Sequence, residues 1–387
     1  EQSDNGGSGW SLVGRAPAQA GRVVWRVPAD GAAVRRVRLT PSWPAAPIAF
    51  DVTLTPSQRA AYRWVCIADT TVPPTRDGAG SLVYKDKMWI LGGWNPAIPY
   101  FPLATGNDVW SSTDGAHWTQ EKQQTYVDRD FDPAVDWEGR HTAGYAVFDG
   151  KMWVLGGDPL QRHYQTDAWY STDGRTWTRA VKTLPWGNRA LFYTLVFQDR
   201  LWVLGGQTMP DFVDPHDTGI PYRVFDDVWV SRDGVSWSSH PVEGPHWQPR
   251  AAIIQSATLH GKMWVIGGGT YEAVSEGRPH RDYFTDVWSS PDGTHWDREA
   301  AATPWTPRQY QSLASWDGKL WVISGYSAEG NQDGAWYSAD GKNWYDTETP
   351  WGPRHASSVW VYKDAVWLSG GGDHDMWRLE RGEWSGP

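Results

Sequence analysis

The chain has 387 residues, a single cysteine and no uninterrupted run of apolar residues long enough for a transmembrane helix. One cysteine excludes an internal disulfide and a cysteine-only metal cluster. The formal net charge of −10, from 45 acidic and 35 basic residues, argues against nucleic acid as a partner, because a phosphate-binding surface needs an excess of basic residues.

The first sixty residues contain strand-like segments but no clear repeat. Residues 23–27, 34–39 and 48–55 have the character of strands, and Pro, Gly and Ala turns separate them. Residues 62–68 also have the character of a strand, and Trp64 precedes Arg76 by twelve residues. That spacing matches the twelve or thirteen residues between the outer-strand tryptophans Trp177, Trp237 and Trp296 and the arginine that follows each.

From residue 76 onward one pattern occurs six times. Each copy has an arginine, an apolar stretch, a tight turn, a tryptophan, Gly-Gly, a loop, Asp-x-Trp and Asp-Gly-x-x-Trp. The arginines are Arg76, Arg140, Arg189, Arg250, Arg308 and Arg354, and the tryptophans are Trp89, Trp153, Trp202, Trp264, Trp321 and Trp367. Short strands repeated at a period of roughly 45–65 residues are the signature of a β-propeller. We therefore expect an all-β propeller of four-stranded blades over residues 61–387.

Two blade counts are open. If residues 62–68 complete the last repeat, the ring has six blades; if residues 22–68 form a blade of their own, it has seven. Trp384 could begin a fourth strand of the last repeat, which favours seven, whereas residues 22–60 lack the Gly-Gly and Asp-x-Trp marks. We expect six, with residues 1–60 forming a strand-containing segment packed outside.

The second copy shows how the strands follow one another. Residues 142–148 and 151–155 are strands joined by Asp149-Gly150, a dipeptide that favours a type I′ hairpin. A third strand is expected at residues 167–170, and Asp173-Gly174 turns the chain toward a fourth. In the last copy the corresponding dipeptide is Arg381-Gly382.

These motifs carry two family resemblances. Paired glycines after an apolar strand, followed by a spaced aromatic, resemble the kelch repeat over about residues 62–384. The Ser-x-Asp-Gly-x-x-Trp turns, at residues 112–118, 171–177 and 338–344, resemble the Asp-boxes of sialidase-like propellers. Both resemblances imply a propeller, but kelch propellers include oxidases, epimerases, specifier proteins and binding modules, so they imply no single activity.

Most catalytic signatures of those families are missing. The kelch-type galactose oxidases need a Cys–Tyr cross-link and a Tyr-His copper pair, but Cys66 is on a predicted outer strand and no Tyr-His dipeptide occurs, so copper-radical chemistry is not expected. The sialidase Phe/Tyr-Arg-Ile-Pro segment has only a poor counterpart at residues 222–225, and the Glu-x3-Asp-x3-His pattern of specifier proteins is absent. The nearest remaining analogue is the periplasmic kelch sialic-acid epimerase type, by fold and ligand charge alone.

Loop lengths distinguish the two faces of the expected disc. The turns within each hairpin that contain Asp-Gly are tight and share one face, which we call the turn face. Residues 94–107, 207–226 and 269–285 form long loops, and residues 119–139 a long blade connection, all on the opposite loop face. Because long loops on a rigid scaffold carry most binding and chemistry, we expect the main pocket on the loop face and a flat turn face.

The repeated arginines are the main candidates for ligand binding. Each begins a first strand near the axis, where it either bonds to a loop carbonyl or an acid of the neighbouring blade as a repeated brace, or clamps a ligand carboxylate together with one or two others. Five copies also carry a tryptophan three residues before the arginine, which either caps the blade or stacks on a ligand. The ligand-binding candidates are Arg76, Arg140, Arg189, Arg250, Arg308, Arg354, Trp137, Trp186, Trp247, Trp305, Trp351 and Tyr310, with Arg140, Arg189, Arg308 and Arg354 as the clamp.

The general acid–base candidates are His141 and His355, which directly follow their arginines, and the loop carboxylates of Asp158, Asp214 and Glu272. Histidines and carboxylates from different loops are compatible with a divalent metal, but no HExxH spacing supports one, and no cofactor is assured.

These observations lead to two functional expectations. The first is an exported, periplasmic or secreted monomer that binds an anionic, carboxylated small molecule, best a sugar acid, at the loop face, with lyase, epimerase or hydrolase chemistry as candidates. Its first residue, Glu1 rather than Met, is compatible with a removed signal peptide. The alternative is a non-catalytic module whose arginines receive an acidic peptide.

Overall fold

The computed structural model describes residues 2–3, 34–39, 48–53, 62–71, 73–74, 76–95, 105–157, 159–214, 219–251 and 255–382. The chain divides into two compact units, residues 1–61 with 383–387 and residues 62–382. Within the described ranges no helix is long and apolar enough to cross a bilayer.

The first unit contains a three-stranded antiparallel sheet, in the order β1 (Gln2–Ser3), β2 (Val34–Leu39) and β3 (Ile48–Thr53). The strand expected at residues 34–39 is confirmed, and that expected at 48–55 is confirmed as far as Thr53. The strand expected at residues 23–27 lies outside the described residues.

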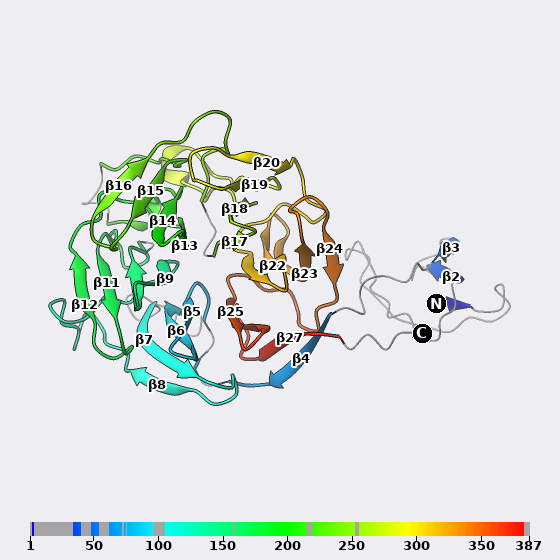
Figure 1. Ribbon diagram of the computed structural model, residues 1–387, viewed down its shortest axis with the longest axis horizontal. Helices are drawn as coiled ribbons and strands as arrows, with labels where there is room; N and C mark the ends of the chain where they lie inside the picture. Colours follow the sequence, from blue (N-terminus) through cyan, green and yellow to red (C-terminus); the bar gives the residue numbers. More distant parts are fainter. Residues whose placement is uncertain are drawn as a thin grey trace. The chain divides into compact units, whose positions relative to one another are not determined.

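The second unit is an all-β propeller of six four-stranded antiparallel blades arranged in a ring (Figure 1). Each blade begins with its innermost strand. Blade one has β5 (Gly80–Tyr84), β6 (Lys87–Trp94), β7 (Thr105–Ser112) and β8 (Thr119–Lys122). Blade two has β9 (Gly144–Phe148), β10 (Lys151–Leu155), β11 (Ala168–Ser171) and β12 (Thr178–Val181). Blade three has β13 (Tyr193–Phe197), β14 (Arg200–Leu204), β15 (Val228–Ser231) and β16 (Trp237–His240).

The remaining blades follow the same order. Blade four has β17 (Ala257–Leu259), β18 (Lys262–Ile266), β19 (Val287–Ser290) and β20 (Asp297–Ala300). Blade five has β21 (Ser312–Trp316), β22 (Lys319–Ser327), β23 (Gly330–Ser338) and β24 (Tyr345–Thr347). Blade six has β25 (Ser358–Tyr362), β26 (Ala365–Ser369), β27 (Met376–Arg381) and β4 (Tyr62–Ala68). The loops contain two short 3-10 helices, η3 (Pro210–Phe212) and η5 (Val274–Glu276).

Blade six is closed by a strand from the start of the propeller. β4 pairs antiparallel with β27, with Trp64 opposite Leu379, so the fourth strand comes from residues 62–68 (Figure 1). This pairing makes the ring six-bladed, and the seven-blade alternative is wrong. Trp384, which had favoured that alternative, lies outside the described residues.

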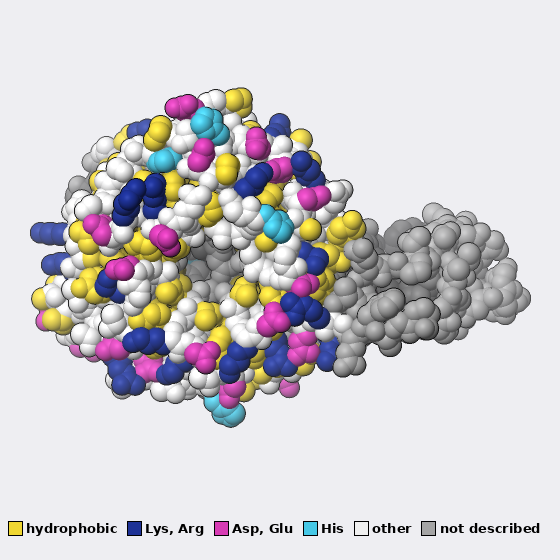
Figure 2. All heavy atoms as spheres, viewed as in Figure 1, with side chains coloured by type: hydrophobic (Ala, Val, Ile, Leu, Met, Phe, Trp, Pro, Cys, Tyr) yellow, Lys and Arg dark blue, Asp and Glu magenta, His cyan; other side chains and the backbone are white. Residues whose placement is uncertain are grey.

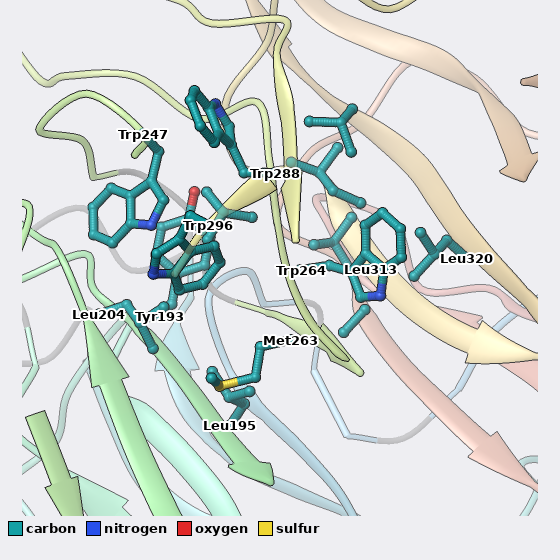
Figure 3. Close-up of a cluster of buried hydrophobic side chains, with 14 of the residues drawn as sticks. Tyr193, Leu195, Leu204, Trp247, Met263, Trp264, Trp288, Trp296, Leu313 and Leu320 are labelled. Carbon is teal, nitrogen blue, oxygen red and sulfur yellow. The ribbon is translucent and has the colours of Figure 1, made fainter. Parts of the chain in front are cut away.

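The second-strand tryptophans form the core between blades. All six are at most 3% exposed, and each indole Nε1 donates to the main-chain oxygen five residues earlier, at the preceding hairpin. Figure 3 shows Trp264 of blade four beside Leu313 of blade five, while Met263, the residue before it, lies beside Leu195 of blade three. The predicted equivalence of these tryptophans is confirmed.

The Asp-Gly turns hold neighbouring blades together. In blade one the Ser112 hydroxyl accepts the main-chain N–H groups of Asp114 and Gly115, and the Asp114 carboxylate accepts those of the next two residues. The same network recurs in blades two to five. Each turn glycine packs on the second-strand tryptophan of the preceding blade, as Gly115 on Trp367, Gly174 on Trp89, Gly234 on Trp153, Gly293 on Trp202 and Gly341 on Trp264.

Blade six has no such turn, because its third and fourth strands come from opposite ends of the propeller. Tyr62 takes the place of the glycine, with its ring edge-on to Trp321 at 4.8 Å between centroids. Its hydroxyl donates to the Asp317 carboxylate, which also accepts from Arg381 of β27. One carboxylate therefore joins both strands of the closure.

Candidate functional site at the loop-face mouth of the channel

The repeated arginines point into their own blades rather than toward the axis. In five blades the guanidinium donates to the aspartate of the Asp-x-Trp motif at 2.6–3.0 Å, through the pairs Arg76–Asp108, Arg140–Asp167, Arg189–Asp227, Arg250–Asp286 and Arg354–Asp375. Nη1 also donates to the main-chain oxygen at the end of the second strand, for example Gly267 for Arg250, at 2.8 Å. Each arginine therefore ties the first strand to the second and third.

The aspartates complete this brace. Each accepts a further hydrogen bond from the indole Nε1 two residues later, as Asp167 does from Trp169 at 2.7 Å. Burial by itself raises the pKa of Asp167, but the Arg140 charge and the hydrogen bonds more than offset it and hold that pKa below its usual value. The Asp167 carboxylate is therefore ionised at neutral pH.

Blade five departs from the pattern by one residue. Asp333 stands three residues before Trp336 instead of two, and Arg308 donates to the main-chain oxygens of Ser324 and Asp333 at 3.1 and 3.3 Å.

This geometry corrects the expected ring of arginines at the mouth. All six are at most 6% exposed, and their guanidinium groups already bond protein acceptors, so the structure favours a brace over the clamp. The acceptors belong to the arginine's own blade and not, as expected, to the neighbouring blade. The tryptophans three residues earlier are also internal, at most 7% exposed, and not placed to stack on a ligand. Each lies against the fourth-strand tryptophan of its own blade, as Trp137–Trp177, Trp186–Trp237, Trp247–Trp296 (Figure 3), Trp305–Trp344 and Trp351–Trp64.

The residues that face the mouth directly follow the arginines. Two positions after the arginine, all five described copies have a left-handed backbone, with φ between 47° and 59° at Gly78, Thr142, Leu191, Tyr310 and Ala356. Main-chain hydrogen bonds at 2.8–3.1 Å connect these positions from blade to blade, from Ala356 N to Tyr310 O, Gly78 N to Ala356 O and Thr142 N to Gly78 O. The chain thus turns sharply at the mouth and presents the residue after each arginine beside its neighbours.

Three titratable side chains meet at this rim, from blades six, one and two. Nε2 of His141 lies 2.9 Å from Oδ1 of Asp77, and Nε2 of His355 lies 3.6 Å from Oδ2. The Asp77 side chain is 7% exposed, and those of His141 and His355 are 16% and 26% exposed. The two candidate histidines are therefore brought together by one buried carboxylate.

Gly78 makes room for this contact. A side-chain carbon built on it would lie 2.2 Å from Cδ2 of His141, and its φ is +56°. The close approach to His141 leaves room only for glycine here, whereas the equivalent positions of other blades hold larger residues at a similar φ.

His355 links the triad to an aromatic and charged neighbourhood. Its Nδ1 lies 2.7 Å from the Asn331 side-chain oxygen, and its ring lies 5.7 Å from Tyr310 and 5.4 Å from Tyr326. Arg281 lies 5.4 Å from the Tyr326 ring and pairs with Glu272 through two nitrogens. We call Asp77, His141, His355, Tyr310, Tyr326, Arg281 and Glu272 the mouth cluster.

The opposite half of the rim is apolar. Ala190, Leu191, Ala251 and Met209 form a buried cluster with Tyr310, and Phe212 and Tyr271 pack against it. Met209, Phe212 and Tyr271 belong to the long loops of blades three and four, which are joined by hydrogen bonds from Val274 N and Ser275 N to Asp211. The mouth therefore has a titratable side and an apolar side.

The other acid–base candidates do not join the cluster in the described structure. Asp158 lies outside the described residues. Asp214 is half-buried and its main-chain N–H donates to the Arg162 oxygen, which ties the loops of blades two and three. Among the residues that the structure describes, no three His, Cys, Asp or Glu side chains are placed to hold a metal ion.

Three residues of the site, Asp77, Arg281 and Asn331, were not among the candidates from the sequence. Asp77 was missed, although it stands immediately after Arg76 as His141 and His355 stand after their arginines. Arg281 and Asn331 were missed because they come from loops or strand ends that differ between copies, so no repeat marks them.

The architecture defines the class of protein, a six-bladed β-propeller with a titratable cluster at one end of its channel. No family model and no curated protein matches the sequence.

Proposed function

We propose that this protein binds a carboxylated small molecule, best a sugar acid, at the mouth cluster and transfers a proton on it. The observation that carries the proposal is the contact of His141 and His355 with the single buried carboxylate of Asp77. Paired histidines oriented by a carboxylate are suited to general acid–base catalysis.

His355 is the better base. If Nδ1 carries the proton, its N–H donates a hydrogen bond to the Asn331 side-chain oxygen, and Nε2 is then the nitrogen that takes up the substrate proton. Burial lowers the pKa of His355, with Asp77 partly offsetting the shift, so the neutral imidazole, the form that can accept a proton, is favoured at neutral pH. Asp77 would then stabilise the imidazolium that forms when the proton arrives.

Arg281 supports an anionic substrate. Its side chain is 19% exposed and its guanidinium lies 3.8 Å from the Tyr271 ring centroid, which fixes its plane. A carboxylate beside Arg281 would be neutralised, which makes the C–H bond next to it easier to deprotonate by His355. His141 would return a proton for epimerisation, or protonate a leaving oxygen for elimination.

We also propose what kind of partner the protein has, which repeat family it resembles and that it is exported. Over the face shown in Figure 2, acidic and basic side chains are interspersed, so no charged patch on that face indicates a polymeric partner. We place the chain among kelch-type propellers by its repeat and expect an exported monomer.

Calorimetry and hydrogen exchange test the proposal. Glucuronate, galacturonate, a sialic acid and an acidic peptide would be titrated into the wild type, Arg281→Met and Arg298→Met, the last an exposed outer-strand control. We expect a sugar acid to bind and Arg281→Met to weaken it about tenfold or more, as for a lost charged hydrogen bond. Arg298→Met should leave the affinity unchanged.

Proton transfer has its own readout. In D₂O the wild type should exchange the substrate C–H next to the carboxylate for deuterium, and His355→Gln should bind but not exchange. Equal sugar-acid affinity in wild type and Arg281→Met would contradict the binding site, and undiminished exchange in His355→Gln would contradict the base. Tightest binding by the acidic peptide would favour an interaction module.

A further inference from the structure

Glu272 and Arg281 are oppositely charged neighbours at the mouth, and both remain partly exposed. Their side chains are 29% and 19% exposed, and both come from the long loop of blade four. Nε and Nη2 of Arg281 donate to the two carboxylate oxygens of Glu272. Nη1 donates to no acceptor among the described residues and is not a buried atom, so the edge formed by Nη1 and Nη2 is accessible to a ligand.

Glu272 also keeps acceptor positions for a ligand. A carboxylate offers about four lone-pair positions, and Arg281 occupies one on each oxygen. Burial and the nearby charge of Asp211 raise the pKa of Glu272, but the hydrogen bonds from Arg281 hold that pKa below its usual value, so the carboxylate is ionised at neutral pH. An ionised acceptor with free lone pairs is suited to an ammonium group.

Tyrosine rings flank this pair. The guanidinium carbon of Arg281 lies 3.8 Å from the ring centroid of Tyr271 and 5.4 Å from that of Tyr326. Burial raises the pKa of Tyr283, and the charges of Arg281 and Glu272 shift it in opposite directions, so this phenol also lies near the pair. Because the face of a tyrosine ring attracts cations, these surroundings favour a ligand with a positive group.

The charges of the mouth cluster do not favour a ligand that is only anionic. Asp77 and Glu272 are carboxylates, and Arg281 is the one permanent cation of the cluster. Unless a histidine is protonated, the cluster therefore has an excess of one negative charge, and burial favours the neutral form of His355. A ligand that adds a carboxylate and no positive group increases this excess.

We propose that the sugar acid bound at the mouth carries an ammonium group on the carbon next to its carboxylate, and that Glu272 makes the site specific for it. The ligand carboxylate bonds the Nη1 and Nη2 edge of Arg281, and the ammonium group bonds the remaining lone pairs of Glu272. Because Glu272 and Arg281 are in direct contact, the two ligand groups must also be neighbours. The inference rests on the function proposed above for the mouth.

D-gluconate and D-glucosaminate test the proposal, because they differ only by a hydroxyl or an ammonium group on the carbon next to the carboxylate. In calorimetry on the full chain, glucosaminate should bind the wild type about tenfold or more tightly than gluconate, as for an added charged hydrogen bond. Glu272→Gln keeps the shape of the side chain and removes its charge. It should weaken glucosaminate binding about tenfold, while gluconate should bind as tightly as before or more tightly.

Glu329→Gln is the matched control, because Glu329 is exposed between β22 and β23 and the substitution removes the same charge from the loop face. It should leave the ratio of the two affinities unchanged, and thermal melts verify that both variants fold. Glucosaminate binding no tighter than gluconate in the wild type would overturn the inference. Equal weakening of both probes by Glu272→Gln would overturn it as well, by showing that Glu272 only positions Arg281.

Failure of this inference and failure of the proposed function are distinguishable. If Arg281→Met weakens the binding of a uronate while the wild type does not prefer glucosaminate to gluconate, the proposed binding site stands and the ammonium specificity is wrong. If Arg281→Met leaves every affinity unchanged, the binding site itself is wrong.

Discussion

At the scale of single residues, the arginine repeated in every blade and the variable residue after it have different surroundings. The arginine that recurs in every blade braces the blade, with the Asp-x-Trp carboxylate as its partner in five of them. The position immediately after it is occupied by Asp77, His141, Ala190, Ala251, Gln309 and His355, and its variation creates the mouth cluster. In this propeller the residue repeated in all six blades supports the fold, and the variable neighbour supplies the side chains to which we assign the proposed proton transfer.

The brace predicts the effect of removing one arginine. Arg250→Ala leaves the Asp286 carboxylate, with a 14% exposed side chain, without its cation and should cost about 3–5 kcal/mol of unfolding free energy. Arg298→Ala, exposed on β20, should stay within about 0.5 kcal/mol of the wild type. Urea unfolding monitored by tryptophan fluorescence measures both. Equal stability of the two variants would contradict the brace.

The mouth cluster predicts a titration. Because burial lowers the pKa of His355, its NMR midpoint should lie below the usual histidine value of 6.5. As the pH falls from 6.5 toward that midpoint, the unfolded chain takes up the proton first, so His355 should reduce stability over this interval. The Asp77 carboxylate raises the pKa, so Asp77→Asn should move the midpoint further down. An upward movement would contradict the assigned contact.

At the scale of strands, the spacing between Trp64 and Arg76 correctly indicated a fourth strand at residues 62–68, whereas Trp384 near the C-terminus favoured the wrong blade count. Trp64 holds the same position as the fourth-strand tryptophans of blades two to five. Its ring lies edge-on to that of Trp351, with 4.5 Å between the centroids. No local rule connects residues 62–68 with 376–381, because a pairing across the whole propeller depends on ring closure. The sequence could therefore present two blade counts but not decide firmly between them.

Truncation tests the closing strand. Removing residues 1–68 leaves β27 as an exposed edge and uncovers Trp351 and Trp377, so this variant should melt at a much lower temperature and aggregate. Removing residues 1–60 retains β4 and is the control, expected to melt cooperatively. Similar melting of the two truncated chains would show that β4 contributes little to the ring.

At the scale of the whole molecule, the ring is held by contacts between consecutive blades. The blade repeat, the hairpin turns and the buried second-strand tryptophans were all predictable, because each follows from a local pattern repeated six times. An acidic or carbonyl partner for each arginine was predicted, but not that the acid is the Asp-x-Trp aspartate of the same repeat. The mouth cluster combines residues from blades six, one and two with loops of blades four and five, so its membership depends on the closed ring.

The contacts between blades predict the effect of one methyl group. Gly234→Ala would place its Cβ 2.4 Å from Trp153 of the preceding blade and should cost about 1–3 kcal/mol more than Gly150→Ala. Gly150 is the matched control, since its φ of +67° resembles the +75° of Gly234 but no atom lies within 4 Å of the added carbon. Chemical denaturation compares them, and equal losses would show that backbone strain alone accounts for the effect.

The closing strand also has a consequence for the order in which the molecule forms. Arg63 and Glu380, which pair across β4 and β27, are separated by 317 residues along the chain. During synthesis β4 is made before any blade and can pair with β27 only after the last blade has been made, so this contact closes a far longer stretch of chain than any pairing inside blades one to five. Contacts so distant in sequence form slowly, and until then both strands expose unpaired edges. The last event of folding is therefore also the one that protects the chain from association with other copies.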